Sequence, residues 1–514
     1  MNKFPGNTIF YTLLLAVDIA LVWLLPYFPT QDGPSHIYNL VILHDLLNGG
    51  KEWGDLFTYE LRATPNLGFH LIAYPLLLFF HPLVVEKLFI SLYLILMGVS
   101  IPVFLKTFSG KIFPFAYFVF PVMFNFCLMM GFYSYVITVP LFLLAVSASW
   151  KIRNYPVPQK ILSFNAMGIV LFYFHLIPAV LYIMSLAIMD LIEYASFRSR
   201  LVNTLKLAGV MAPWFIIFSL YMWRSFSLSG HPQPITHISD IDLSRDFFSF
   251  STVIFDPLQQ VLAAILLFLI LFFFSVSLSK VVKGYLQKRT SLSDIPRQKK
   301  FLFCFLISLI FIYFFAPFNL GDGSFFNQRF PWIIFLFTLP LLQFPERVSV
   351  QCLCSIVLAT VALMSIALNF RILSQQSIVV RNFLRGTVAD INKGAYVMLY
   401  RDGNSDWSRA DVLLHAVSHY GMEKKCVDIG NYEVSYNIFP VKYKRKLPSI
   451  PAWDKVEYEP ETIRWDKYPS IDYLIAWKAD LASRREIGRF FHIIWEDKLL
   501  TIWQRNTRIK VNMR

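Results

Sequence analysis

Five consecutive residues, Asp32-Gly33-Pro34-Ser35-His36, bring a carboxylate and an imidazole to the end of the first apolar segment of the chain. Gly33-Pro34 predicts a turn, and Ser35 is placed to cap a helix whose apolar stripe ends at Asn48-Gly49-Gly50. We expect this helix to be amphipathic and to lie on the outer membrane surface. Its free N–H groups favour a nearby anion such as a phosphate, beside an ionised Asp32 that can accept a proton.

Asp32 is therefore a candidate general base and His36 a candidate substrate-binding residue. The same stretch is also explained if Asp32 and Ser35 serve only the turn and the helix cap. Residues 32–36 alone do not decide between the two interpretations.

Arg62, Asn66 and His70 lie where the chain returns from the first loop to an apolar segment. We take all three as candidate substrate-binding residues that line the same site as Asp32. For each residue taken singly, a structural role explains its type and position as well.

Arg329 comes soon after the loop Gly321-Asp322-Gly323-Ser324, whose glycines allow a close approach of the backbone to a ligand. A guanidinium group binds phosphate oxygens two at a time. We therefore take Arg329 and Asp322 as candidate substrate-binding residues. An arginine that anchors its helix at the interface, or pairs with Asp322, explains the same sequence.

Two polar residues lie deeper in apolar segments. Asp18 is in the middle of the first segment, where a carboxyl group is costly and is by default functional. It suits either a proton path or a bond to a partner within the helical bundle. His175 is expected to be a buried histidine with a hydrogen-bond partner rather than a ligand.

The composition of the 514 residues excludes an ordinary soluble protein, because 56% are hydrophobic and only 16% are charged. The mean hydropathy of +0.52 agrees. A spanning helix needs about 20 mainly apolar residues. Such segments lie near 8–28, 66–81, 84–105, 112–128, 131–150, 161–193, 207–223, 257–279, 301–316, 331–345 and 348–369.

The segment 161–193 is long enough for two short spans with a break near Pro178, so we predict a polytopic α-helical membrane protein of about 10 to 13 spans. The first segment lacks a signal-peptide cleavage site, so we predict that it is retained. Residues 1–369 form the predicted membrane domain. Residues 370–514 form a predicted second domain outside the membrane.

Basic residues predict the orientation, because short loops rich in Lys and Arg stay in the cytoplasm. Residues 280–300 carry seven of them and are placed inside, together with the N-terminus. The outer loops are then 29–65, 225–256 and 317–331, and the C-terminal domain is extracytoplasmic. Lys106 and Lys111 also indicate the cytoplasm. If Asp32 is outside, the chain must cross the membrane an odd number of times between Asp32 and Lys106. Two apolar segments lie in this interval, so the two indications conflict. Either residues 68–81 enter and leave on one side, or one basic turn breaks the rule.

The net charge of +14 is explained by cytoplasmic turns that face anionic lipid, so we expect no nucleic-acid partner. The five cysteines show no zinc-binding spacing, and we predict no metal or cofactor site from them. The chain has no Asn-x-Ser/Thr sequon, which favours a prokaryotic plasma membrane.

In the C-terminal region, strands are predicted at 396–400, 472–477 and 499–504, and helices at 411–420 and 483–495. Strands that alternate with helices are typical of a small α/β domain. No phosphate loop, zinc spacing or nucleophile elbow is present in it. We therefore expect a non-catalytic domain.

An inward-to-outward first span, an acid in the first outer loop, many further spans and an exported C-terminal domain together resemble the GT-C superfamily of membrane glycosyltransferases. Segments 32–39, 131–135, 174–179 and 327–330 are similar to recurring pieces of its bacterial members. The resemblance covers the whole membrane domain, although each motif is short.

The resemblance implies transfer of a sugar from a polyprenyl-phosphate carrier to a glycan, lipid or protein acceptor at the outer face of the membrane. Asp32 matches the first-loop acid, which implies a general base in an inverting reaction. No second acid stands beside Asp32, so a metal-independent reaction is favoured, and the sequence leaves a divalent ion open.

Three other classes of function fit the same composition. A transporter or flippase of lipid-linked glycans is favoured by Asp18 but lacks the expected internal repeats. A glycan polymerase is chemically close to the transferase. A noncatalytic envelope scaffold predicts that Asp32 can be replaced without loss.

Overall fold

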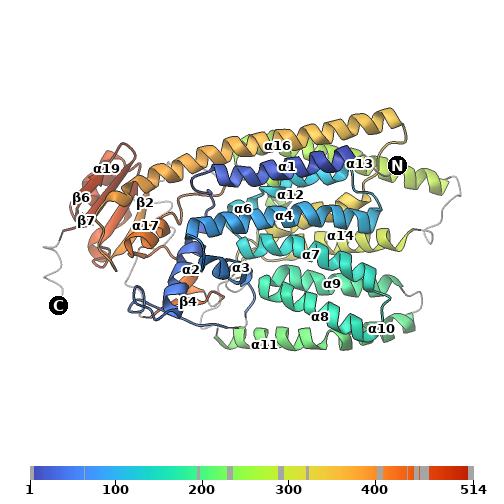
Figure 1. The fold of residues 1–514 in the computed structure, drawn as a ribbon, viewed down its shortest axis with the longest axis horizontal. Coiled ribbons are helices and arrows are strands. Elements are labelled where there is room, and N and C mark those ends of the chain that lie inside the picture. The colour runs from blue at the N-terminus through green and yellow to red at the C-terminus, as the bar shows by residue number, and fades with distance from the viewer. Residues whose placement is uncertain are drawn as a thin grey trace.

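The apolar segments fold into a bundle of long helices that carries a mixed α/β domain at one end (Figure 1). The structure is a computed structural model that describes residues 5–62, 64–193, 197–228, 235–286, 295–319, 323–401, 409–436, 438–444, 451 and 462–506. The N-terminus lies at the end of the bundle away from the α/β domain (Figure 1).

Among the described residues, eight helices are long and apolar enough to cross a membrane. They are α1 (Pro5–Leu24), α4 (Pro82–Ser109), α7 (Tyr133–Ile152), α8 (Val157–Phe174), α9 (Leu176–Glu193), α13 (Gln260–Leu286), α14 (Arg297–Phe315) and α16 (Val348–Phe383). The pair α10 (Phe197–Val210) and α11 (Ala212–Leu228) is bent by 69° and counts as a possible ninth span. The predicted polytopic α-helical membrane fold is confirmed.

Three of the segments predicted as spans form shorter helices. Residues 66–81 contain α3 (Gly68–Leu77), and residues 331–345 contain the end of α15 (Phe326–Thr338) and η5 (Leu339–Leu341). Residues 112–128 form a chain of short pieces, η1 (Phe115–Val119), α5 (Phe120–Met123) and α6 (Phe126–Met129). The break in 161–193 falls at the extended His175, because Pro178 fits in the first turn of α9.

Helix α3 bears on whether residues 68–81 cross the membrane, which decides if Asp32 and Lys106 can lie on opposite sides. Its ten residues span about 15 Å, half the thickness of the hydrocarbon layer. It lies beside α2 at the α/β end of the bundle, and α4 alone then connects this end to Lys106 and Lys111 (Figure 1). The geometry therefore favours a segment that enters and leaves on one side.

Helix α2 (Gly33–Leu47) does not lie on the surface as predicted. Residues Gly33–Leu40, Ile42 and Leu43 are buried, because the C-terminal domain covers the polar face of the helix. The Asn39 and Asn431 amides bond to each other in both directions, at 2.8 and 2.9 Å. Helix α17 (Val417–Lys424) packs so closely that a Cβ on Gly421 would stand 2.7 Å from the Tyr38 ring.

The C-terminal domain is built on a five-stranded sheet of order β3-β2-β5-β7-β6. Strand β2 is parallel to β3 and β5, and β7 is antiparallel to β5 and β6. The strands are β2 (Tyr396–Arg401), β3 (Val427–Asp428), β5 (Tyr473–Trp477), β6 (Phe491–Glu496) and β7 (Leu500–Arg505). Separately, β1 (Phe57–Tyr59) of the first loop pairs with β4 (Val441–Tyr443), so the two regions share a small sheet.

The helix predicted at 483–495 is wrong in its second half. Helix α19 covers Leu481–Ile487, and the chain continues as β6. The run Phe491–Trp495 is rich in aromatic and β-branched residues, and it pairs with β7 across a tight turn. The helix predicted at 411–420 begins later, at Val417.

The remaining outer segments also gather at the α/β end. Thr236 and Asn319 form a bridge between the loops predicted at 225–256 and 317–331. Arg409 of the C-terminal domain donates to the carbonyl oxygens of Ser251 and Ile254. The short elements here are α12 (Asp240–Phe248), η2 (Ser251–Val253), η3 (Pro257–Gln259), η6 (Leu384–Val388), η7 (Glu433–Ser435) and η9 (Trp465–Lys467).

The Asn39–Asn431 pair gives a test of how firmly the C-terminal domain is held. Asn431→Ala leaves the buried Asn39 amide without its partner, and we expect a loss of about 1–3 kcal/mol of stability. Thermal unfolding of the purified protein in detergent measures it. Asn48→Ala, at the exposed end of α2, is the control and should change stability by less than about 0.5 kcal/mol. Equal effects of the two changes would contradict the interface.

Candidate functional site

Asp32 stands at the N-cap of α2, with its backbone against the turn that precedes α7. Its N–H donates to the Met130 carbonyl oxygen at 3.3 Å, and the Gln31 N–H donates to that of Met129 at 2.9 Å. Gly131 has a φ of +84°, and a Cβ there would lie 2.8 Å from the Asp32 Cβ. Glycine at position 131 is thus needed both for its backbone conformation and for the close approach.

The Asp32 carboxylate is 7% exposed and has three polar neighbours. Gln31 Nε2 donates to Oδ1 at 3.2 Å, the Tyr432 hydroxyl donates to Oδ2 at 3.3 Å, and His415 Nε2 lies 3.5 Å from Oδ1. Burial raises the pKa of Asp32 to about 6, although the charge on His36 and the donors Gln31 and Tyr432 act in the opposite direction. Asp32 is therefore mainly ionised at neutral pH and close to the point where it takes up a proton.

His415 does not neutralise Asp32. Burial lowers the pKa of His415 to about 4, so its ring is uncharged at neutral pH. The ring packs against that of Tyr432, with a centroid distance of 4.9 Å. Both residues come from the C-terminal domain, which therefore supplies part of the surroundings of Asp32.

His36 is held within the protein. Its Nδ1 lies 2.7 Å from Oε1 of the buried Glu433, and its Nε2 lies 2.9 Å from the Gly131 carbonyl oxygen. The Glu433 carboxylate beside Nδ1 favours the ring with both nitrogens protonated, which is a cation. Burial alone would lower the pKa of His36, but the Glu433 carboxylate outweighs it and the pKa is raised. Both ring nitrogens, which we expected to meet substrate, face groups of the protein.

Arg329 lies on α15 in a nest of aromatic rings. Its Cζ is 4.7 Å from the Phe132 ring centre and 5.5 Å from that of Tyr135, whose hydroxyl donates to the Arg329 carbonyl oxygen at 2.6 Å. Within the described part of the chain, no carboxylate lies within ion-pair distance of its guanidinium, although Asp32 is near enough to act on its charge. An unpaired cation near Asp32 suits a phosphate. The predicted partner Asp322 lies outside the described residues.

The short segments that carry the family resemblance meet in space. Residues 131–135 contact Asp32 through Gly131 and Arg329 through Phe132 and Tyr135. The His175 ring lies 5.2 Å from that of Tyr135, and His175 Nδ1 accepts the Ile177 N–H at 3.2 Å. His175 is thus a buried histidine with a hydrogen-bond partner.

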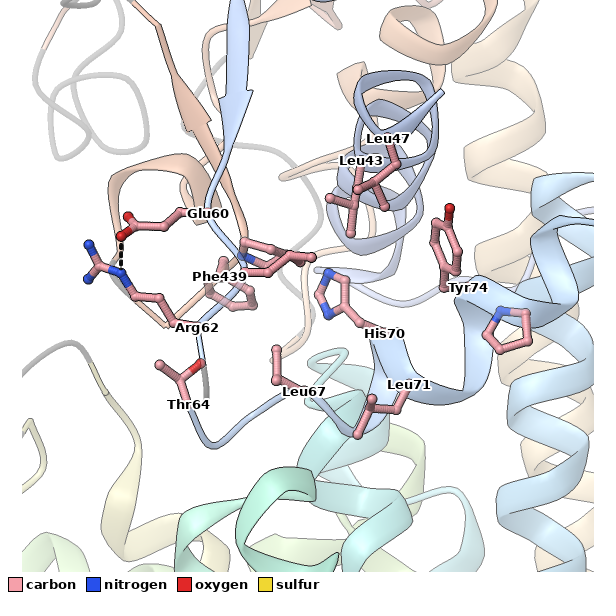
Figure 2. A pocket seen from close by; sticks show the side chains of 13 residues that line it. Leu43, Leu47, Glu60, Arg62, Thr64, Leu67, His70, Leu71, Tyr74 and Phe439 are labelled. Carbon is pink, nitrogen blue, oxygen red and sulfur yellow. Dashed lines mark ion pairs between the residues drawn. The ribbon is translucent and has the colours of Figure 1, made fainter. Parts of the chain in front are cut away.

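Arg62 and His70 lie elsewhere, on a cavity of about 360 Å³ that Asp32, His36 and Arg329 do not line (Figure 2). Arg62 forms an ion pair with Glu60. Asn66 does not line the cavity, and its carbonyl oxygen accepts the Ser134 hydroxyl at 3.0 Å. Of the predicted site residues, Asp32, His36 and Arg329 belong to one group, Arg62 and His70 line the cavity, and Asn66 belongs to neither. We call the first group, with its neighbours, the Asp32 cluster: Asp32, Gln31, His36, Arg329, His415, Tyr432 and Glu433.

Sequence reasoning missed the members of the cluster that come from the C-terminal domain. His415, Tyr432 and Glu433 carry no motif, and about four hundred positions separate Tyr432 from Asp32. Sequence reasoning also missed a buried pair in the membrane domain. The Tyr133 hydroxyl donates a hydrogen bond to Glu86 at 2.5 Å. Asp18 is buried, and neither of its carboxylate oxygens has a hydrogen-bond partner. In the described residues, no group of three or more His, Cys, Asp or Glu is arranged to hold a metal ion.

The comparison with solved structures bears on the fold. A multi-pass helical bundle that carries an α/β domain at one end agrees with the predicted GT-C-like fold, which is confirmed. The structure is similar to the crystal structure of ArnT from Cupriavidus metallidurans bound to undecaprenyl phosphate. The TM-score is 0.50 at 10% sequence identity, over 99% of each chain. No protein-family model matches the sequence, and no curated protein sequence matches it significantly.

The raised pKa of Asp32 makes stability depend on pH. The folded protein binds this proton more tightly than the unfolded chain, whose Asp32 has the ordinary pKa of 3.8, so the carboxylate costs stability as the pH rises from about 4 to about 6. Asp32→Asn carries no such cost. We expect the variant to exceed the wild type by about 2–3 kcal/mol at pH 7 and to equal it near pH 4.

Thermal unfolding of both proteins at a series of pH values measures this difference. Other groups titrate in the same range, and burial raises the pKa of Asp428 to about 6 as well. The difference in stability between variant and wild type at each pH removes their contribution, because both proteins contain them. A difference that does not change between pH 4 and pH 7 would show that Asp32 is not desolvated.

Proposed function

We propose that this protein transfers a sugar from a polyprenyl-phosphate donor to an acceptor at the outer face of the plasma membrane. The observation that carries the proposal is a buried Asp32 carboxylate near the Arg329 guanidinium, which has no ion-pair partner among the described residues, within a GT-C-like fold. One group suits proton abstraction and the other suits a phosphate.

Asp32 acts as the general base in this mechanism. It takes the proton of the acceptor hydroxyl while the hydroxyl oxygen attacks the anomeric carbon of the sugar. The bond from that carbon to the carrier phosphate oxygen breaks on the opposite face, so the anomeric configuration inverts. A base with a pKa of about 6 is well matched to this step near neutral pH.

Arg329 receives the leaving phosphate. Negative charge grows on the phosphate oxygen as the sugar departs, and a fixed cation in aromatic surroundings stabilises that charge more than water does. The rings of Phe132, Tyr135 and Phe326 hold the guanidinium at centroid distances of 4.7, 5.5 and 5.7 Å. Because the Arg329 guanidinium is already in place, it does not have to move or reorient while the phosphate departs.

Two considerations support the lipid carrier and the location. ArnT, whose fold is similar, was crystallised with undecaprenyl phosphate, which supports a polyprenyl-phosphate donor for this chain. The end of α13, with Lys280 and Lys283, and the beginning of α14, with Arg297, Lys299 and Lys300, lie at the end of the bundle away from α2 and the Asp32 cluster (Figure 1). A cytoplasmic N-terminus and an exported C-terminal domain follow from the positive-inside rule.

A second candidate, transport of a lipid-linked glycan, is favoured by Asp18. A buried acid without a partner in a spanning helix is expected in a proton path. Movement of a labelled lipid-linked glycan across proteoliposomes, lost on Asp18→Asn and kept on Asp32→Asn, would support transport in place of transfer.

Removal of the base tests the proposal. Asp32→Asn should lower the rate of sugar transfer about 10²- to 10⁴-fold while donor binding persists. The assay follows transfer from a panel of radiolabelled polyprenyl-phosphate sugars by purified protein in lipid, with the anomeric configuration of the product read by NMR. Asp45→Asn, on the same helix but outside the cluster, is the control and should stay near wild type. Equal transfer by Asp32→Asn and wild type would remove Asp32 from catalysis.

The pH dependence of transfer follows from the same group. Only ionised Asp32 accepts a proton, so kcat/KM should fall about tenfold per pH unit below a midpoint near 6. The pH profile of the wild type measures the midpoint. A flat profile from pH 5 to pH 8 would exclude a base with this pKa.

The phosphate-binding role of Arg329 has a distinct signature. Arg329→Gln should reduce kcat/KM for the donor about 10²-fold, because a charge-assisted contact with the leaving phosphate is lost. Arg329→Lys keeps the charge and should recover part of this loss. Arg371→Gln, an exposed arginine on α16, is the matched control. If Arg329→Gln left kcat/KM for the donor unchanged, the donor phosphate would have to bind at another part of the protein.

A further inference from the structure

The cavity beside His70 is separate from the Asp32 cluster and has its own chemistry. It lies between the C-terminal half of α2, residues 60–62 and 64–67, α3 and the turn Phe439–Pro440 of the C-terminal domain (Figure 2). No residue of the Asp32 cluster lines the cavity, and Phe439, which does line it, has its ring 6.0 Å from that of His36. A volume of about 360 Å³ is within the range of cavities that hold small molecules.

His70 gives the cavity its polar centre. The side chain projects into the cavity between Leu43, Leu71 and Phe439 (Figure 2). It is 6% exposed, and neither ring nitrogen has a hydrogen-bond partner. An imidazole buried in this state has lost its bonds to water, and a ligand that restores one of them gains free energy.

The residues that line the cavity carry little net charge. Arg62 is paired with Glu60 at one end of the cavity, so its guanidinium is already compensated (Figure 2). Burial favours the uncharged His70 ring and the charge on His36 acts in the same direction, whereas the Glu433 carboxylate opposes them more weakly than burial. An uncharged imidazole offers one donor and one acceptor, which match a hydroxyl or an ester group better than a phosphate.

The cavity opens toward a lipid-facing surface. Its lining residues Leu61 and Leu71 are 66% and 50% exposed. The same apolar surface continues past the end of α3 with Leu78 and Phe79, which are 53% and 79% exposed. Large apolar side chains at this level of a membrane protein face the bilayer. The occupant therefore enters from the membrane.

We propose that this cavity binds a membrane lipid with an uncharged polar end, whose hydrocarbon chain lies along the leucines and whose hydroxyl or ester group bonds to His70. A neutral glycerolipid of the bilayer and the lipid part of a glycolipid acceptor share this chemistry. The inference uses neither Asp32 nor the transfer reaction, and it assigns Arg62 and His70 to a lipid site of their own.

Photocrosslinking tests the proposal with the full-length protein in detergent. The probe is a monoacylglycerol that carries a diazirine in its chain, and mass spectrometry maps the labelled peptides. We expect labelling within residues 60–75. Unlabelled monoolein should compete for this labelling at least about tenfold better than lysophosphatidic acid of the same chain, since a phosphate finds no free cation here.

Two variants separate the cavity from general lipid contact. Leu71→Trp fills the cavity and should reduce labelling at least about fivefold, whereas Leu78→Trp, exposed on the same surface outside the cavity, should leave it unchanged. His70→Leu keeps the volume and removes the polar partner, so the affinity for the monoacylglycerol should fall about two- to tenfold. A plain alkyl diazirine should be captured equally by His70→Leu and wild type.

Labelling that Leu71→Trp leaves intact, or that lysophosphatidic acid displaces as well as monoolein, would overturn the proposal. The two sources of the lipid are distinguished by sugar transfer: monoolein inhibits competitively against the acceptor if the cavity holds the acceptor lipid, and has no effect if it holds a bilayer lipid. Photocrosslinking does not require sugar transfer. The binding result can therefore be interpreted even if the proposed transferase activity is not found.

Discussion

The structure depends on the burial of a polar helix end between two domains. The N-terminal turns of α2 lie between the helical bundle and the C-terminal domain, where neither water nor lipid can satisfy their polar groups. The His36–Glu433 pair and the Asn39–Asn431 amides satisfy them instead. Each partner is buried, so the loss of either would strand the other at a considerable cost. This mutual requirement fixes the C-terminal domain over Asp32.

The same burial sets the chemistry of Asp32. A carboxylate on an exposed surface helix would titrate near its ordinary pKa and would have little affinity for a proton at neutral pH. Covered by His415 and Tyr432, it becomes a stronger base, and the nearby cation Arg329 remains unpaired within the described structure. The sequence of the C-terminal domain has no phosphate loop, zinc spacing or nucleophile elbow, yet the domain changes the properties of a residue in the first loop.

Much of the membrane fold was predictable from the sequence, because long apolar segments have few alternatives to spanning helices. Hydropathy alone did not separate spans from shorter helices such as α3, since both are apolar and only length in the fold distinguishes them. In the candidate site, Asp32 and Arg329 could be proposed from the sequence because each follows an apolar segment or a glycine-rich turn, and their roles stay predictions. Glu433 and Tyr432 could not be proposed in this way, because their importance arises from tertiary contact across the whole chain. The α2 surface prediction failed for the same reason: its polar face meets protein rather than water.

The pairing of β1 with β4 has a consequence for the order of assembly. Phe57–Tyr59 emerges early in synthesis and Val441–Tyr443 emerges near its end, so the first loop waits for its partner strand while the helices between them are inserted. Until that strand arrives, Asp32 has neither Tyr432 nor His415 beside it. An unfinished chain therefore carries an exposed, ordinary aspartate, and the buried base comes into being when the last part of the protein closes over it.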